Sequence, residues 1–364
     1  MNNELPYQIA LTLTENIGVV TAKKLVEHFG NASDIFIAGK KELYNAGIPR
    51  DAVESIKSFN DFSIVEKEIA FINQYNIEPL FITQKNYPQR LLNCYDPPVL
   101  LYYKGNADLN QTKIISIVGT RSNTPYGKKI TEAIIEKISA QNILIVSGLA
   151  YGIDTIAHKA ALGNGLPTIG VLANGLKNIY PAENKNLAKE MIAGGGILSE
   201  LLHDAKPDRY NFPKRNRIVA GMADATIVIE TSRKGGSMIT AEIASSYGRE
   251  VFAVPGRIGD DKNEGCNYLI QSNKAQIFTD VEQFLFTMNW DVSKKKARQQ
   301  TIAFADLSPQ EQKVVDALRS KNTLHIDELK AASGLSSGEL ANAILNLELS
   351  NIVEALPGKM YKLD

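Results

Sequence analysis

The chain has 364 residues, 44% of them apolar and 22% charged, which is the composition of an ordinary globular protein of two or three domains. Its 40 Lys and Arg balance 40 Asp and Glu, and its two cysteines, Cys94 and Cys266, indicate neither a disulfide framework nor a cysteine-rich metal site. No apolar run approaches the roughly 18 residues of a membrane span and MNNELPYQIA has no signal-peptide pattern, so we expect a cytoplasmic protein without a membrane segment, metal or cofactor.

Residues 1–75 are predicted to form a helical domain. The segments IGVVTAKKLVEHFG and NAGIPRDAVESIK each place apolar residues at helical spacing after a glycine turn, in the manner of a helix-hairpin-helix element. Such elements can contact a DNA backbone. Residues 1–111, however, carry 10 Lys and Arg against 13 Asp and Glu, so we favour a packing or docking module over a DNA contact.

Residues 76–290 are predicted to form an extended Rossmann-like α/β domain with a doubly wound, mostly parallel sheet. The apolar segments IISIV, ILIV, TIGVLA, ATIVIE and VFAV are expected to be strands. They alternate with helices expected at 125–140, 153–163, 183–193, 212–222 and 236–247. Strands separated by helices of this length form βαβ units and hence a parallel sheet.

The predicted strands run into turns rich in glycine, hydroxyl and basic residues. Because the carboxyl ends of parallel strands lie along one edge of the sheet, these turns should form a common ligand-binding edge. Glycine lets the backbone approach an anion, and arginine and hydroxyl groups hold it. The candidate cations and hydroxyls are Arg121, Ser122, Lys177, Lys214, Arg215, Arg217, Ser237 and Thr240. The sequence therefore predicts an extended anion-binding edge.

The surroundings of this edge favour single-stranded nucleic acid as the anion. Residues 112–280 hold 20 Lys and Arg against 16 Asp and Glu, and aromatic residues such as Tyr180 and Phe212 lie among the candidates. Cations that follow a phosphate backbone, with aromatic rings available for base stacking, are typical of single-strand binding. The sequence leaves open which of Arg215 and Arg217 faces the ligand and which pairs with a carboxylate in the core.

A nucleotide-processing enzyme that cleaves an N-glycosidic bond is the alternative. The sequence contains no GxGxxG fingerprint, Walker A motif, GxSxG elbow or HExxH motif. Asp154 and His158 share a helix face and could pair as acid and base, and Glu242 follows a glycine-rich turn. We favour the simpler interpretation, in which Asp154 stabilises the first turn of its helix and His158 packs against a neighbouring element.

Residues 291–306 are predicted to be a polar, basic linker, and residues 307–364 a winged-helix domain of three short helices and a hairpin with a Pro-Gly turn. This domain has 6 Lys and Arg against 8 Asp and Glu, and its candidate recognition helix, SSGELANAILNLELS, contains no cation. Because DNA affinity depends on cations that neutralise phosphates, we favour a protein-contact or vestigial role for this domain.

A series of short motifs runs through residues 80–280. In chain order they are Tyr87-Pro88, Asp96-Pro97-Pro98, Val118-Gly119-Thr120-Arg121, SGLAYGID from Ser147, Tyr180-Pro181, FPKRNR from Phe212, Gly235-Gly236-Ser237 with Thr240-Ala241, and Gly265-Cys266-Asn267. This series closely resembles that of the DprA/Smf family of bacterial DNA-processing proteins. The flanks fit too, because members of that family often carry a SAM-like helical domain before the core and a winged helix after it.

The resemblance implies a non-enzymatic protein that binds single-stranded DNA during natural transformation and loads the RecA recombinase onto it. It also implies a homodimer joined through the extended Rossmann domain. The turn of Gly119, Arg121 and Ser122 would then grip phosphates, Lys177 and the FPKRNR segment would extend this basic site, and Gly235, Gly236 and Ser237 would line it.

Overall fold

The computed structural model describes residues 4–290, 307–321, 323–350, 352–356 and 359–363. The predicted linker, 291–306, lies outside the described residues. The chain divides into two compact units, residues 1–284 and 285–364. Within the described ranges no helix is long and apolar enough to cross a membrane, and no cluster of His, Cys, Asp and Glu could hold a metal ion.

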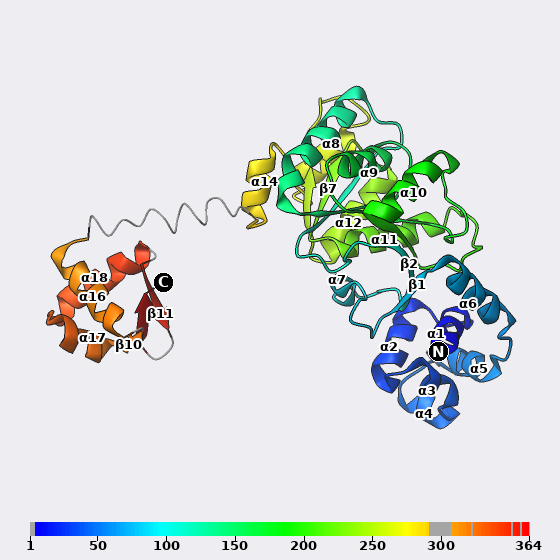
Figure 1. The fold of residues 1–364 in the computed structure, drawn as a ribbon, viewed down its shortest axis with the longest axis horizontal. Helices are drawn as coiled ribbons and strands as arrows, with labels where there is room; N and C mark the ends of the chain where they lie inside the picture. The colour runs from blue at the N-terminus through cyan, green and yellow to red at the C-terminus, as the bar shows by residue number, and fades with distance from the viewer. Residues whose placement is uncertain (1–3, 291–306, 322, 351, 357–358, 364) are drawn as a thin grey trace. The chain divides into compact units, whose positions relative to one another are not determined.

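Residues 4–75 are mainly helical, as predicted (Figure 1). The helices are α1 (Leu5–Leu13), α2 (Val19–Phe29), α3 (Ala32–Ile37), α4 (Lys40–Asn45), α5 (Arg50–Ser58) and α6 (Ser63–Tyr75). Residues with a left-handed or positive-φ backbone stop two of them, Gly30 after α2 and Asn76 after α6. The apolar faces of these helices bury residues such as Ile9 and Leu25 in the same core cluster as the strands that follow.

Within the described residues nine strands form one sheet, in the order β1-β2-β6-β5-β4-β3-β7-β8-β9. They are β1 (Glu78–Phe81), β2 (Leu100–Gly105), β3 (Ile114–Gly119), β4 (Leu144–Ser147), β5 (Thr168–Val171), β6 (Gly195–Ser199), β7 (Ala225–Ile229), β8 (Glu250–Ala253) and β9 (Gln276–Ile277). All pairs among β3 to β9 are parallel, whereas β2 pairs antiparallel with β1 and β6. The prediction of a mostly parallel sheet is confirmed.

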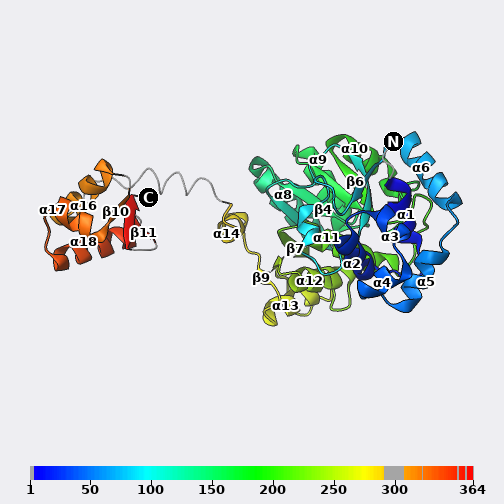
Figure 2. The ribbon, with the colours of Figure 1, turned by 90° about the horizontal axis from the view of Figure 1, so that it is seen from below.

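Helices cover both faces of this sheet, as a doubly wound fold requires (Figure 2). The connecting helices are α7 (Gln89–Leu92), α8 (Pro125–Ile138), α9 (Ile153–Gly163), α10 (Lys185–Gly194), α11 (Asn211–Met222), α12 (Gly236–Ser246), α13 (Glu264–Gln271) and α14 (Val281–Thr287). Figure 2 shows α8, α9 and α10 on one face and α11 and α12 on the other. Because both faces are covered, β3, β4, β5 and β7 are buried almost throughout and carry continuous apolar runs.

The strand order reverses direction at β3. From β3 the chain moves outward through β4, β5 and β6, then returns to place β7 on the other side of β3. The crossovers on the two sides of β3 therefore leave toward opposite faces of the sheet, because parallel crossovers are right-handed. A crevice opens at the carboxyl ends of the strands where such a reversal occurs.

The N-terminal helices are attached to the sheet by a buried carboxylate. Glu68 on α6 is 2% exposed and accepts hydrogen bonds from the backbone N–H of His203, at 3.1 Å, and from its ring Nδ1, at 2.6 Å. The His203 ring also stacks on Phe71, with ring centroids 4.3 Å apart. On the other side of the helical segment, Lys23 donates to the carbonyl of Cys94 at 3.3 Å.

The second unit is a winged helix, as predicted. It comprises α16 (Pro309–Ser320), β10 (Thr323–His325), α17 (Ile326–Ser333), α18 (Ser337–Leu349), β11 (Val353–Leu356) and β12 (Met360–Leu363), and the strands pair antiparallel in the order β10-β12-β11. Ser308 and Ser336 begin α16 and α18 with capping boxes. The exposed side of α18 presents Leu345 and Leu349 rather than cations.

Replacing Glu68 with alanine should lower the free energy of unfolding by about 2–3 kcal/mol, because the buried donors of His203 lose a charged acceptor. Glu66→Ala, an exposed position on the same helix, should cost less than about 1 kcal/mol. Urea denaturation of both variants measures the difference. Equal losses would contradict the role of Glu68 in attaching the helices.

Candidate functional site

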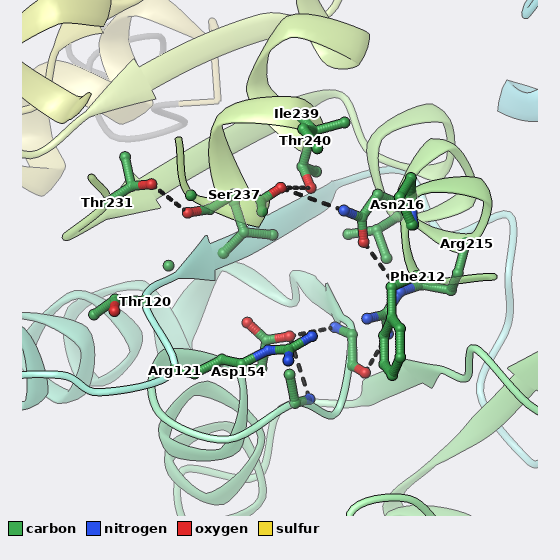
Figure 3. Close-up of a pocket in the computed structure, with 18 of the residues that line it drawn as sticks. Thr120, Arg121, Asp154, Phe212, Arg215, Asn216, Thr231, Ser237, Ile239 and Thr240 are labelled. Carbon is green, nitrogen blue, oxygen red and sulfur yellow. Dashed lines mark hydrogen bonds between the residues drawn. The ribbon is translucent and has the colours of Figure 1, made fainter. Parts of the chain in front are cut away.

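A cavity of about 430 Å³ occupies the crevice where the strand order reverses (Figure 3). Its walls come from the turns that follow β3, β4 and β7 and from the first turns of α11 and α12. Seven of the predicted site residues line it, namely Gly119, Arg121, Arg215, Gly235, Gly236, Ser237 and Thr240. The turn sequences along the edge therefore meet in one place, because parallel strands end at the same edge.

The turn after β3 needs glycine for a packing reason. A Cβ on Gly119 would lie 2.0 Å from the carbonyl oxygen of Ile229, the neighbouring residue on β7. Gly236 differs, because a Cβ there would meet no atom within 4 Å. Gly119 is thus required by the sheet itself, whereas the absence of a side chain at Gly236 keeps the cavity open.

Hydroxyl groups line one side of the cavity. Ser237 donates to Thr231 Oγ1 at 2.7 Å, and Figure 3 shows both residues with Thr240 across the cavity from Arg121 and Asp154. Ser237 and Thr240 lie in the first turn and a half of α12, whose N-terminus has no side-chain cap. Backbone N–H groups at such a helix start attract anions.

Arg121 is the exposed cation of the cavity wall. Its guanidinium carbon lies 5.0 Å from the centre of the Phe212 ring, so the planar group is held over an aromatic face. A stacked guanidinium keeps its N–H groups at the edge of the plane, where they can donate to a phosphate. Phe212 begins the FPKRNR segment, so α11 positions the main cation of the turn after β3.

The floor of the cavity holds a buried pair of opposite charges. Arg215, 5% exposed, donates to the carbonyl oxygens of Gly148 and Val171, and burial lowers its pKa to about 10, so it stays charged at neutral pH. Asp154 accepts from the backbone N–H of Gly148 at 3.1 Å and of Ala150 at 3.3 Å. Burial raises the pKa of Asp154, and the guanidinium of Arg215 opposes that shift.

Arg217 points away from this cavity. It forms an ion pair with the carboxylate of Glu200, and its Nε lies 3.9 Å from Asp96 Oδ2. Of the two arginines that the sequence left undecided, Arg215 lines the cavity and Arg217 pairs with carboxylates. The reason is geometric, because residues two apart on a helix point in nearly opposite directions.

The remaining candidates lie outside the cavity wall. Ser122 is exposed, and its carbonyl accepts a hydrogen bond from Lys262. Lys177 is exposed, and its backbone N–H donates to the carbonyl of His203 at 3.0 Å. Lys214 is exposed and lines a second cavity. None of these three residues lines the first cavity.

The acid–base candidates do not share a site. His158 is fully buried, and its Nδ1 lies 2.7 Å from Thr168 Oγ1. Burial lowers the pKa of His158 to about 3, so the ring is neutral. Glu242 forms an ion pair with Lys274 at 3.0 Å on the surface. The structure therefore agrees with the packing interpretation of His158 and places Glu242 outside the lining of the cavity.

Several lining residues were not among the predicted site residues, namely Thr120, Gly148, Ala150, Asp154, Phe212, Asn216, Thr231 and Ser232. Thr231 and Ser232 directly follow the predicted strand ATIVIE. Because residues at the carboxyl ends of parallel strands lie along one edge, the sequence also indicated these two hydroxyls. Asn216 carries no charge and gave no signal of its own, but its side chain donates to the carbonyl of Gly236 at 3.3 Å and joins α11 to α12.

Two family models match the chain. The model of DNA recombination-mediator protein A matches residues 78–289, and that of the DprA winged helix domain matches residues 299–359. Protein Smf of Synechocystis sp. is 30% identical over 99% of both chains. The DNA processing protein DprA of Streptococcus pneumoniae is 44% identical, over 55% of this chain and 70% of its own.

Two solved structures are similar to this fold. DNA processing protein A from Streptococcus pneumoniae superposes with a TM-score of 0.66 at 35% identity and covers 77% of this chain and 96% of its own. DNA processing protein A from Helicobacter pylori, whose structure was determined for its single-stranded DNA binding mode, superposes with a TM-score of 0.54 at 32% identity. That match covers 60% of this chain and 97% of the other.

Arg217→Ala should lower the free energy of unfolding by about 3–5 kcal/mol, because it leaves the carboxylate of Glu200 buried without its partner. Arg233→Ala, which breaks an exposed pair with Glu264, should cost less than about 1 kcal/mol. Guanidinium denaturation at neutral pH provides the comparison. A small loss for Arg217→Ala would show that Glu200 does not depend on this arginine.

The buried His158 predicts a pH dependence of stability. The unfolded chain binds a proton at this histidine below pH of about 6.5, and the folded chain does so only near its lowered pKa of about 3. The unfolded state therefore binds more protons between these values, and the contribution of His158 to stability is lost as the pH falls. Relative to His158→Asn, wild type should lose about 1 kcal/mol or more between pH of about 6.5 and 5, measured by urea denaturation. Parallel pH profiles would contradict the assignment.

Proposed function

The chain belongs to the DprA/Smf family of DNA-processing proteins, as its motif series predicted. From this membership we propose that it binds single-stranded DNA at the cavity beside the carboxyl ends of β3, β4 and β7. The observation that carries the proposal is the position of Arg121, an exposed guanidinium stacked on Phe212 at the carboxyl edge of the sheet. The single-strand binding reported for the Helicobacter pylori relative supports the choice of ligand.

The cavity offers two kinds of donor to one phosphate group. Arg121 provides a planar cation, and the start of α12 provides its backbone N–H groups. Gly236 lets the phosphate approach this helix start, because no side chain stands in the way. A site of this kind recognises the backbone of the strand, so it should bind strands of different sequence with similar affinity.

Arg121 is exposed and is therefore the cation of the cavity that a phosphate reaches most directly. Arg215 is buried on the floor, where it donates to the carbonyl oxygens of Gly148 and Val171. We propose that Lys177, Lys214 and Ser122 contact neighbouring phosphates from outside the cavity. Aromatic rings near the path, such as Phe212, would add base stacking, which is independent of sequence.

The wider role that we propose is to load RecA recombinase onto the bound strand during natural transformation, as a homodimer joined through the Rossmann-like domain. The support for this part is family membership together with the edge strand β9, where Ile277 is half-exposed. We further propose that the role is binding rather than catalysis. His158 is buried against Thr168 and Glu242 pairs with Lys274, and neither lines the cavity, which supports this choice over N-glycosidic cleavage.

Arg121→Ala should weaken the binding of single-stranded DNA about tenfold or more at low salt, because a charge-assisted hydrogen bond to phosphate is lost. The slope of log affinity against log salt concentration should also fall by roughly 0.7, the value for one phosphate contact on a single strand. Fluorescence anisotropy with labelled strands of several sequences, competed by duplex of equal length, measures both quantities.

The matched control is Arg50→Ala, an exposed arginine at the start of α5. It should bind like wild type throughout the salt series. If Arg121→Ala also binds like wild type, the cavity is not the DNA site. If wild type binds neither single strand nor duplex and instead releases a base from nucleoside monophosphates, the enzymatic alternative replaces the proposal.

A further inference from the structure

A second and larger cavity, of about 630 Å³, lies in the first unit between the N-terminal helices and the sheet. Leu11 on α1 and Val19 on α2 contribute one wall, and Val99, Leu201 and Ile243 contribute the other. The lining is mainly apolar with a few polar groups near it, which is the usual character of a ligand-binding cavity. Except for Pro213, the residues that line this cavity do not line the first cavity.

The exposed Tyr95 lines this cavity and packs against a second tyrosine, Tyr247. Tyr95 is 63% exposed, and its ring meets that of Tyr247 edge to face, with centroids 5.2 Å apart and planes at 64°. The hydroxyl of Tyr247 donates to the carboxylate of Asp96, and burial raises the pKa of Tyr247, so the donor keeps its proton. Asp96 lies in turn beside Arg217, at 3.9 Å. The ring of Tyr95 is therefore both accessible and held in place.

The two cavities are adjacent. Pro213 contributes to the walls of both, and it stands between Phe212, which lines the first, and Lys214, which lines the second. Each cavity is thus lined by an exposed cation and an aromatic ring, and the start of α11 contributes one member of each pair. In the first the pair is Arg121 and Phe212, and in the second it is Lys214 and Tyr95.

The cations of the second cavity differ in availability. Arg217 is neutralised by Glu200 and Asp96. Lys214 has no ion pair within 4 Å among the residues that the structure describes, so its ammonium is available to a ligand. A ligand of this cavity therefore needs a flat apolar body for the lining and for Tyr95, and one negative charge near Lys214. A nucleotide of a single strand has both features.

We propose that the second cavity is a base-binding subsite for a nucleotide next to the one whose phosphate the first cavity holds. The base enters between the N-terminal helices and the sheet and stacks on Tyr95, while its phosphate contacts Lys214. This inference rests on the proposed binding of single-stranded DNA and extends it. It gives the N-terminal helices a part in DNA binding that needs no positive charge, since they contribute an apolar wall.

The test uses the full chain and a series of labelled oligothymidylates from about two to about 16 nucleotides, a range that covers the usual site sizes of single-strand binding proteins. Tyr95→Ala should weaken the binding of the longer strands about tenfold, because base–aromatic stacking is lost, and leave the shortest bound strand unaffected. Arg121→Ala should weaken binding at every length. Tyr44→Ala, which removes another half-exposed tyrosine on α4, should bind like wild type.

A second variant fills the cavity instead of removing the ring of Tyr95. Gly18 lines the cavity at the start of α2, has a backbone that any residue can adopt, and has no atom within 4 Å of a built Cβ. Gly18→Leu should therefore fold, and it should weaken the binding of the longer strands as Tyr95→Ala does. Gly18→Ala should fold and bind these strands like wild type. Photo-crosslinking of a strand that carries 4-thiothymidine should label the peptide containing Tyr95 in wild type.

The outcomes separate the two proposals. If Arg121→Ala binds strands of every length with the affinity of wild type, the first cavity is not the DNA site. If Arg121→Ala loses affinity while Tyr95→Ala and Gly18→Leu bind all lengths like wild type, the first cavity holds DNA and the second does not. Length-dependent losses in both second-cavity variants, together with the crosslink, would establish the subsite.

Discussion

The functional site depends on the reversal of strand order at β3. With β4 on one side of β3 and β7 on the other, the crossover helices leave toward opposite faces and leave the strand ends uncovered between them. Every feature of the first cavity follows from this topology. The turn after β3 supplies Arg121, and the reversal brings the starts of α11 and α12 against it with their aromatic and hydroxyl groups.

The balance of charge decides how the protein can hold a polyanion. The chain is neutral overall, and the arginines of α11 are engaged by the fold, Arg217 by Glu200 and Arg215 by backbone carbonyls above Asp154. Of the predicted site cations, Arg121, Lys177 and Lys214 remain exposed. In the DNA binding that we propose, such a surface would combine a small number of phosphate contacts with base stacking, neither of which depends on base sequence.

The N-terminal helices pack against the sheet domain and share its hydrophobic core. Glu68 joins α6 to His203, and α1 and α2 share a core with β1 and β2. Their net negative charge, which argues against a DNA-contacting surface, is compatible with an apolar wall beside Tyr95. The winged helix has a different chemistry, because Leu345 and Leu349 on α18 suit contact with protein rather than phosphate.

The parallel strands and their helices could be predicted from local sequence, because β3, β4, β5 and β7 are continuous apolar runs and the helices between them have clear glycine, proline and polar boundaries. The strand β6 was not predicted, since Gly195 and Gly196 resemble a turn. The structure shows why glycine occupies this strand, because a Cβ on Gly196 would lie 2.4 Å from the ring of Tyr103. The motif order indicated the family and this edge of the sheet as the candidate binding site. Which arginine faces that edge was decided only by tertiary structure, because the partners of Arg215 and Arg217 come from distant segments that approach opposite sides of α11.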